Sequence, residues 1–245
     1  MPVFFVAEPH IANDILTITG ALLDHLRRSL RMTVGEEFWV GNHRRRRYLV
    51  RIQTINSREL QGRVIEERDG PLGRHPSVIV GQALLKGDRM DWVIQKATEL
   101  GVAAIVPLVT DRAIARPRHE RIHAQQERWQ RIALEASQQA ERWDVPLIRL
   151  PERATDWFTG ATGSVKLILS ERACTDSLTS VPLPQGSDAT IALCIGPEGG
   201  WTEEEKAAAH VAGMKPVTLG SYILRAETAA LAAVAILQGR LGEIG

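Results

Sequence analysis

An apolar run that stops abruptly in a glycine-rich turn is the feature that most constrains this chain of 245 residues. The run Ile191–Ile195 is typical of a buried strand, and Gly-Pro-Glu-Gly-Gly-Trp-Thr follows it directly. Glycine accepts positive φ and lets a ligand approach the main chain closely, whereas proline fixes its own φ. Thr202, with Glu205 three residues later, forms a capping box that predicts the start of a helix. Strand, glycine turn and helix together predict a ligand loop at the carboxyl end of a parallel sheet.

The residues around that turn also constrain the ligand. The N-terminus of a helix attracts anions such as phosphate through its free N–H groups and its dipole. Here the first helical turn already carries Glu203, Glu204 and Glu205, whose charges would repel a phosphate. Neither a Gly-x-x-x-x-Gly-Lys-Ser/Thr loop nor a Gly-x-Gly-x-x-Gly fingerprint occurs in the chain. The loop therefore favours a neutral or cationic ligand held by the main chain, and a tight turn without a ligand is the alternative.

A second stretch, residues 217–230, repeats the arrangement. It begins with a short apolar run, continues through Gly220 and ends in the alanine-rich start of a helix. The two stretches lie about one helix apart in the sequence. Because consecutive strands are usually neighbours in a sheet, we expect both loops at one sheet edge, where they would form a single ligand site.

These two stretches resemble a known family. Gly-Pro-Glu-Gly-Gly, followed by Leu-Gly-x-x-Ile-Leu-Arg-x-Glu-Thr-Ala, is similar to the RsmE-type 16S rRNA uridine-N3 methyltransferases of the SPOUT superfamily. Two earlier motifs match in the same order: Gln95–Val102 with Ile105 and Pro107, and Glu135, Ala136, Gln139, Arg142, Val145 and Pro146. The resemblance implies a deep trefoil knot at the C-terminal end, with loops that form an S-adenosylmethionine pocket. Threaded chains are rare, and no pattern in the sequence predicts the knot independently.

The distribution of strands and helices predicts two domains joined by a linker. Over residues 1–70, β-branched and aromatic runs predict strands at 3–6, 15–18, 37–40, 47–52 and 60–65, with a helix at 21–31. A small β-barrel with one helix is the natural interpretation, and residues 25–35 resemble the PUA-like RNA-binding domain of the family. Residues 71–76 are dense in turn residues, which predicts the linker.

Strands alternate with helices over residues 77–245. Strands are predicted at 77–85, 103–109, 147–150, 165–169 and 191–195, and helices at 88–100, 120–143 and 227–241. Asp88 is the predicted N-cap of the first helix and Gly101 its stop. This alternation predicts an α/β fold, a parallel sheet with helices on both faces. With the resemblance, the expected fold is a knotted SPOUT-type α/β domain preceded by a PUA-like barrel.

Composition sets further bounds. The net charge of +1 gives no argument for nucleic-acid binding from bulk charge, although arginines cluster locally. The chain has two cysteines, Cys174 and Cys194, and no metal-ligand spacing, so we expect neither a disulfide framework nor a metal. It has no apolar run long enough to span a membrane and no signal-peptide pattern. We therefore expect a cytoplasmic protein without a membrane partner.

The resemblance assigns cofactor binding to three loops. Main-chain groups would hold the adenosine of S-adenosylmethionine, and apolar side chains would line an adenine slot. Plain core is the alternative for those leucines and isoleucines. The residues expected to bind the cofactor are Leu169, Ser170, Ile195, Gly196, Pro197, Gly199, Gly200, Leu219, Gly220, Ile223, Leu224, Arg225 and Thr228.

Methylation at uridine N3 places a demand on the catalytic residues. N3 carries a proton at neutral pH, so it needs a general base or a cation that stabilises the uracil anion. Arg225 is the expected cation, because it stands in a cofactor loop and stays charged. Glu227 and Glu198 are the candidate carboxylates. Glu227 has an alternative role facing a helix dipole, and Glu198 has one in bracing the turn, so the proton acceptor stays open.

A set of polar residues is expected to contact RNA: Arg28, Arg31, Arg44, Arg45, Arg46, Arg47, Gln139 and Arg142. The alternative for the arginine run is a solvated hairpin tip. Gln139 and Arg142, three apart on one predicted helix face, would reach the active site of a partner subunit or form a polar helix edge. The apolar stripe of the last helix suggests a homodimer, with a fully internal core helix as the alternative.

The interpretation that unites these features is an S-adenosylmethionine-dependent enzyme that methylates N3 of a specific uridine in 16S rRNA of the small ribosomal subunit. The resemblance implies the decoding-centre region, where the target base would be turned out of its stack. A non-catalytic RNA-binding or ribosome-assembly protein with the same fold is the alternative. A nucleotide-using transferase is disfavoured by the missing phosphate motif. The sequence identifies neither the uridine nor whether the substrate is free rRNA or an assembled subunit.

Overall fold

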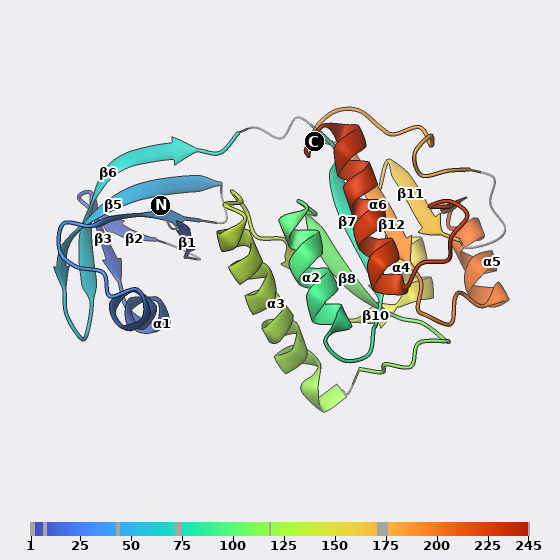
Figure 1. Cartoon of the computed structure of the whole chain (residues 1–245), viewed down its shortest axis with the longest axis horizontal. Helices are drawn as coiled ribbons and strands as arrows, with labels where there is room; N and C mark the ends of the chain where they lie inside the picture. The colour runs from blue at the N-terminus through green and yellow to red at the C-terminus, as the bar shows by residue number, and fades with distance from the viewer. Residues whose placement is uncertain are drawn as a thin grey trace. The chain divides into compact units, whose positions relative to one another are not determined.

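An antiparallel sheet forms most of the N-terminal part of the chain, and a parallel sheet covered by helices forms the C-terminal part (Figure 1). The computed structural model describes residues 3–6, 9–42, 45–71, 75–117, 119–170 and 176–244. The chain divides into two units. The first unit consists of residues 1–72 with 137–145, and the second of residues 73–136 with 146–245.

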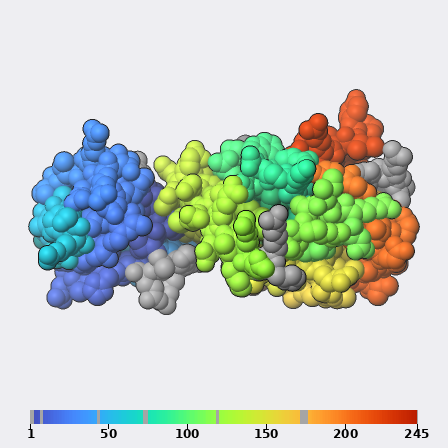
Figure 2. Space-filling model, turned by 90° about the horizontal axis from the view of Figure 1, so that it is seen from below, coloured from blue at the N-terminus to red at the C-terminus, as the bar shows by residue number. Residues whose placement is uncertain are grey.

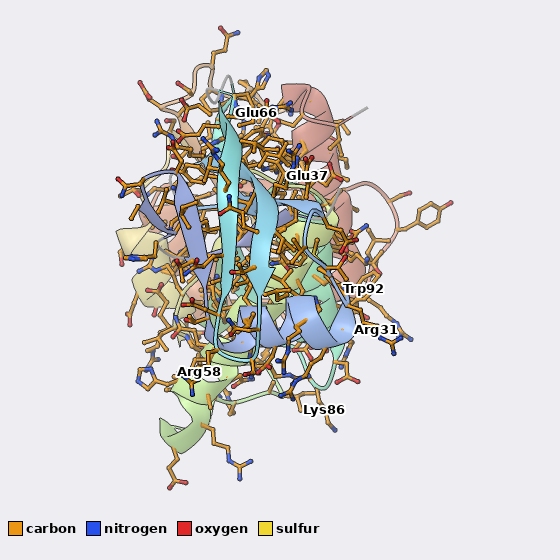
Figure 3. All side chains as sticks on the ribbon, turned by 90° about the vertical axis from the view of Figure 1, so that its left-hand side faces the viewer. Arg31, Glu37, Arg58, Glu66, Lys86 and Trp92 are labelled. Atoms are coloured by element: carbon orange, nitrogen blue, oxygen red, sulfur yellow. The ribbon has the colours of Figure 1, made fainter. Side chains whose placement is uncertain are left out.

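The first unit is built on a sheet with the strand order β1-β4-β5-β6-β3-β2. Its strands are β1 (Val3–Phe5), β2 (His10–Ala12), β3 (Ile15–Ile18), β4 (Glu37–Gly41), β5 (Arg46–Ile55) and β6 (Leu60–Asp69). β1 pairs with β4 in parallel, and the other pairs are antiparallel. Alternate side chains of the strands face one core, in which Phe38 is fully buried. Figure 3 labels Arg58, which lies in the turn between β5 and β6, and Glu66 further along β6.

One short helical segment covers this core. α1 (Gly20–Asp24) continues as a π-helical turn, His25–Ser29, and the two place Leu23 and Leu26 in the core. The helix predicted at 21–31 is thus confirmed in position but ends earlier, and Arg31 has a φ of +54°. The strands predicted in this region are confirmed within a few residues. β2 was not predicted, because its three residues contain too little apolar pattern.

The second unit contains a wholly parallel sheet with the order β10-β8-β7-β12-β11-β13, and β9 also pairs with β8. Its strands are β7 (Ser77–Ala83), β8 (Ala104–Val109), β9 (Leu147–Ile148), β10 (Glu152–Arg153), β11 (Val165–Leu169), β12 (Thr190–Ile195) and β13 (Lys215–Val217). The central strands are nearly continuous apolar runs, because a parallel sheet is buried on both faces. The sequence prediction of an α/β fold is confirmed.

Helices cover both faces of this sheet. α2 (Arg89–Glu99) and α6 (Ala226–Leu241) pack against one another, and α6 lies on β7 and β12 (Figure 1). α4 (Ala154–Gly160) and α5 (Glu203–Val211) pack together on the opposite face. There Trp157, Phe158 and Ala209 join Leu108 and Cys194 in one core cluster. α3 (Ile122–Gln139), preceded by the 3-10 turn His119–Arg121, buries Trp129.

Three sequence predictions for this unit need correction. The helix predicted to reach residue 143 ends at Gln139, because Glu141 takes a left-handed φ of +50° and the following residues belong to the first unit. The strand predicted at 147–150 is only the two-residue β9, and neither β10 nor α4 was predicted. Asp88 is the N-cap of α2, but its side chain makes no capping hydrogen bond. Gly101 ends α2 as predicted, with a φ of +89°.

The absent side chain of Gly81 in β7 allows the α4 indole to lie on the sheet. A Cβ at Gly81 would lie 2.9 Å from the Trp157 ring and 3.0 Å from Leu108 Cδ1. Gly81→Ala should therefore lower the free energy of unfolding by about 1–3 kcal/mol through overpacking. Gly160→Ala is the matched control, because a Cβ there has no atom within 4 Å. Urea denaturation measures both variants, and equal stabilities would contradict the packing argument.

Candidate cofactor-binding and active site

Three parallel strands end together at one edge of the second unit's sheet. β11 lies between β12 and β13, so the two loops predicted to share an edge do so, although one strand separates them. A cavity of about 440 Å³ lies at this edge, within the range of small-molecule sites. The predicted cofactor-binding residues that line it are Leu169, Ser170, Ile195, Gly196, Pro197, Gly199, Gly200, Leu219, Gly220, Ile223, Leu224 and Arg225. Thr228 lines a neighbouring depression instead.

Trp201 fixes the glycine loop to the neighbouring strand. Its side chain is buried, and its Nε1–H donates to the carbonyl of Leu169 at the end of β11 at 3.1 Å. A Cβ on Gly196 would lie only 3.0 Å from the indole, so a larger residue there would push the ring away. Gly200, with a φ of +69°, closes the turn by donating its N–H to the carbonyl of Pro197 at 2.9 Å.

Glu205 joins the same loop to the end of β8. Its side chain is buried, and its Oε2 accepts the N–H of Thr202 at 2.9 Å. Thr202 Oγ1 accepts the N–H of Glu205 at 3.1 Å, so the predicted capping box is confirmed. The other oxygen, Oε1, accepts the N–H of Asp111 at 2.9 Å. One carboxylate therefore binds the glycine loop to a segment more than ninety residues away in the chain.

Arg112 adds a second connection between these two segments. Its Nη1 donates to the carbonyl of Gly199 at 3.2 Å. The same nitrogen makes a longer hydrogen bond, of 3.4 Å, to the carbonyl of Trp201. A Cβ on Gly199 would lie 3.1 Å from Arg112 Cβ, so glycine permits this close approach. In the space-filling view the segment after β8 (green) lies beside α5 and its preceding loop (orange) (Figure 2).

The third loop, between β13 and α6, carries apolar side chains on the open side of the cavity. Thr218 Oγ1 accepts the N–H of Gly220 at 3.2 Å, and Gly220 has a φ of +124° that few side chains tolerate. Tyr222 is 86% exposed and Ile223 is 58% exposed, yet both line the cavity. These apolar groups are available to a ligand rather than to the protein core.

Charged side chains surround the point where the cavity meets the first turn of α6. Arg89 Nη1 lies 2.6 Å from Glu198 Oε1 and 3.9 Å from Glu227 Oε2. Glu227 lies in the first turn of α6 as predicted, is 9% exposed, and its Oε2 has no hydrogen-bond partner among the described residues. Arg225 is the N-cap residue of α6, and its exposed side chain forms no ion pair with a described residue. The three predicted catalytic residues therefore lie along one stretch of the site's rim.

Cys194 lies directly beneath the glycine loop in β12. Burial raises the pKa of its thiol well above the usual value, and the nearby Glu205 carboxylate raises it further. The thiol therefore stays protonated and packs as part of the core.

The predicted RNA-binding arginine run at 44–47 makes contacts within the first unit. Arg47 stacks over the ring of Trp143, 4.0 Å from its centroid, and donates to the carbonyl of Arg142 at 2.7 Å. Burial lowers the pKa of Arg47 from its ordinary value. Arg45 Nη1 lies 3.4 Å from Asp144 Oδ2, while Arg46 Nε donates to Asp69 Oδ1 at 2.8 Å and Arg44 lies outside the described residues.

The other predicted RNA-binding residues differ in their surroundings. Arg31 is exposed and Arg28 pairs with Asp24 of the preceding turn at 3.2 Å (Figure 3 labels Arg31). Gln139 is exposed at the end of α3. Arg142 does not share a helix face with it, because α3 has already ended, and its guanidinium bonds to Asp144 at 2.7 Å.

Sequence reasoning missed Arg89 and did not assign Arg112 to the pocket. Arg89 bridges two predicted catalytic carboxylates, but no local pattern indicates that the start of α2 lies beside the start of α6. The structure places the guanidinium of Arg112 on the glycine loop, although the two segments lie far apart in the chain. Among the residues that the structure describes, no cluster of His, Cys, Asp and Glu could hold a metal ion. No described helix is long and apolar enough to cross a bilayer.

The fold and the site define an α/β protein with a small-ligand pocket at the carboxyl edge of a parallel sheet, attached to a separate β-rich module. A family model described as an RNA methyltransferase domain matches residues 73–238, and one described as an RNA methyltransferase PUA domain matches residues 18–65. A curated relative from Synechocystis, named ribosomal RNA small subunit methyltransferase E, is 33% identical and covers 96% of this chain and 77% of its own. The chain belongs to the RNA methyltransferase family, in the group of the ribosomal RNA small subunit methyltransferase E proteins.

Two solved structures resemble the whole chain. The ribosomal RNA small subunit methyltransferase E of Neisseria gonorrhoeae, bound to S-adenosyl methionine, is 32% identical, has a TM-score of 0.86 and covers 98% of each chain. A methyltransferase structure from Legionella pneumophila with bound S-adenosylmethionine is 29% identical, has a TM-score of 0.88 and covers 97% of each chain.

Replacing Glu205 tests how the glycine loop is held. In Glu205→Gln the amide can accept only one of the two N–H groups, and its NH₂ faces the other donor. We expect the free energy of unfolding to fall by about 1–3 kcal/mol, together with weaker S-adenosylmethionine binding. Urea denaturation and calorimetric titration measure the two effects. Glu204→Gln, an exposed neighbour in the same helical turn, is the control, and equal behaviour of both variants would refute the role of Glu205.

Proposed function

We propose that this protein transfers the methyl group of S-adenosylmethionine to N3 of a specific uridine in 16S rRNA. The observation that carries the proposal is the cavity at the ends of β11, β12 and β13, with Arg225 and the two carboxylates at its rim. The names of the relatives and the cofactor in two similar structures support the same chemistry. A target in ribosomal RNA would also place the protein in the cytoplasm.

The residues of the cavity fit the proposed cofactor. Its floor is main chain at three strand ends, where Gly196 and Gly199 already touch Trp201 and Arg112 and admit no larger side chain. Ile223 and Leu224 supply apolar surface for a planar ring, and main-chain groups of the three loops would supply hydrogen bonds. The cofactor brings an already activated methyl group, so the protein mainly has to align the acceptor with it.

Arg225 is proposed to stabilise the negative charge that develops on the uracil. It lies at the junction of the cavity and the neighbouring depression, and its guanidinium forms no ion pair with a described carboxylate. Glu227 is the better placed of the two carboxylates to accept the N3 proton, because its Oε2 has no hydrogen-bond partner. Glu198 is held by Arg89 at 2.6 Å, which suits a bracing role.

The remaining parts of the chain are proposed to provide RNA binding and assembly. Residues 1–70 would act as a PUA-like barrel that binds RNA, with the exposed Arg28 and Arg31 among its cations, and residues 77–245 as the catalytic domain. Arg45, Arg46, Arg47 and Arg142 would have to exchange intramolecular contacts for phosphates.

A homodimer, to which Gln139 could contribute across the interface, and the trefoil knot complete the proposal. The path of the chain supports the knot. From β13, which lies at the edge of the sheet next to β11, the chain returns to α6, which packs on β7 and β12.

Mass spectrometry of ribosomal RNA tests the function directly. Cells that lack the protein should lose one N3-methyluridine from 16S rRNA, and expression of the wild-type chain should restore it. Unchanged 16S rRNA, with S-adenosylmethionine binding intact, would point to another RNA substrate. Absence of S-adenosylmethionine binding would instead favour the non-catalytic RNA-binding alternative.

Arg225→Ala should lower kcat by roughly 100- to 1,000-fold, the usual cost of removing one group that stabilises a developing negative charge. The side chain is exposed, so the melting temperature should stay within about 2 °C of wild type, as for most surface substitutions. Single-turnover methylation of small ribosomal subunits measures the effect. Arg225→Lys retains the charge and should recover part of the rate, whereas full activity of the alanine variant would remove Arg225 from the mechanism.

A further inference from the structure

A second depression lies beside the cofactor cavity. Two of its residues, Arg225 and Glu227, have proposed catalytic roles, but no ligand has yet been assigned to the depression itself. It is lined by Asp88, Arg89, Trp92, Arg225, Glu227 and Thr228. Arg225 lines both hollows, so they are adjacent at that residue. A group that sits in the depression therefore lies next to whatever occupies the cofactor cavity.

The depression forms where the first turns of α2 and α6 come together. Arg89 and Trp92 belong to the first turn of α2, and Glu227 and Thr228 to that of α6, and the two helices pack against each other. The positive ends of both helix dipoles and two guanidinium groups thus face one small region. Such a region stabilises a group that acquires negative charge, as a pyrimidine does when N3 loses its proton.

Trp92 gives the depression an aromatic wall. Its side chain is 45% exposed, although tryptophan is usually well buried, and Figure 3 labels it on α2. It is surrounded by charged residues rather than by an apolar patch of its own. An exposed indole face of this kind is a stacking surface for a planar base.

Glu227 supplies the polar group that points to a particular ligand. It is 9% exposed and its Oε2 lacks a hydrogen-bond partner among the described residues. The nearest cation, Arg89 Nη1, is 3.9 Å away and is engaged with Glu198 at 2.6 Å. A buried acceptor of this kind requires a donor, and uracil N3–H is one, whereas cytosine N3 is itself an acceptor.

We infer that this depression is the target-base subsite, in which Trp92 stacks on the flipped pyrimidine while Glu227 Oε2 accepts N3–H and so selects uracil over cytosine. The inference rests on the proposed function. In the reaction the N3 proton passes to the Glu227 carboxylate, the N3 lone pair bonds to the methyl carbon, and the electron pair of the broken C–S bond stays on sulfur. Arg89 is a positioning residue that holds Glu198 and orients Glu227.

The first test uses the full chain, S-adenosylmethionine and small ribosomal subunits from cells that lack the protein. Trp92→Ala should lower kcat/KM roughly tenfold, the size of one lost base–aromatic stack. Trp92→Phe keeps an aromatic face and should stay within about twofold of wild type. Calorimetric affinity for S-adenosylmethionine should be unchanged in both. Val211→Ala, which removes exposed apolar surface from α5, is the control.

The second test measures base selection. RNA carrying uridine or cytidine at the methylated position competes for binding to wild type and to Glu227→Gln. We expect wild type to bind the uridine RNA more tightly than the cytidine RNA. In Glu227→Gln this ratio of affinities should fall roughly tenfold or more, because the amide can donate to cytosine N3. An unchanged preference would overturn the role of Glu227.

The outcomes separate the inference from the proposed function. If wild type binds S-adenosylmethionine and methylates a uridine, but Trp92→Ala retains full kcat/KM, only the subsite is wrong. If Trp92→Ala loses cofactor affinity or changes sedimentation from dimer to monomer, Trp92 belongs to the cofactor pocket or to a subunit interface, and the subsite is again wrong. If wild type methylates no uridine, the proposed function fails as well.

Discussion

The buried carboxylate of Glu205 is the interaction on which the site depends. It accepts the N–H groups of Thr202 and Asp111, which lie in segments far apart in the chain. Trp201 extends the same connection to the carbonyl of Leu169. A buried charge is tolerated only when it is hydrogen-bonded, so the contacts that stabilise Glu205 also hold the ends of β8, β11 and β12 in register. These hydrogen bonds therefore fix the glycine-loop side of the cavity to the sheet edge.

The charges around this cavity agree with the ligands proposed for it. The glutamates that open α5 occupy the positive end of that helix, which removes the usual attraction for phosphate. At the start of α6 the charged groups differ, because two guanidinium groups, those of Arg225 and Arg89, flank one buried carboxylate, Glu227. The proposed cationic methyl donor and the proposed acceptor, which would become anionic, would thus have distinct, adjacent surroundings. Methyl transfer needs little more than this alignment.

The arginine run of the first unit, which the sequence predicts to contact RNA, makes intramolecular contacts in the structure. Arg47 lies on the ring of Trp143 and Arg45 lies beside Asp144, so the segment that follows α3 is fastened to the sheet of the first unit. Stacking and hydrogen bonds to carbonyl groups use the planar guanidinium, which lysine could not replace. Any contact of these residues with RNA phosphates has to compete with these intramolecular partners.

The sequence by itself determined the strand and helix alternation, the capping box at Thr202 and Glu205, and the loops that carry the pocket residues. These are local properties, in which period, glycine and capping chemistry act within a few residues. It could not give the break after Gln139, because the left-handed Glu141 is fixed by packing of the next segment on the first unit. Nor could the sequence predict that Arg89 lies beside Glu198 and Glu227, or that the Glu205 carboxylate accepts the N–H of Asp111. Only the tertiary structure decided those pairs, since they join residues that are distant in the chain and meet only when parallel strands and their helices pack.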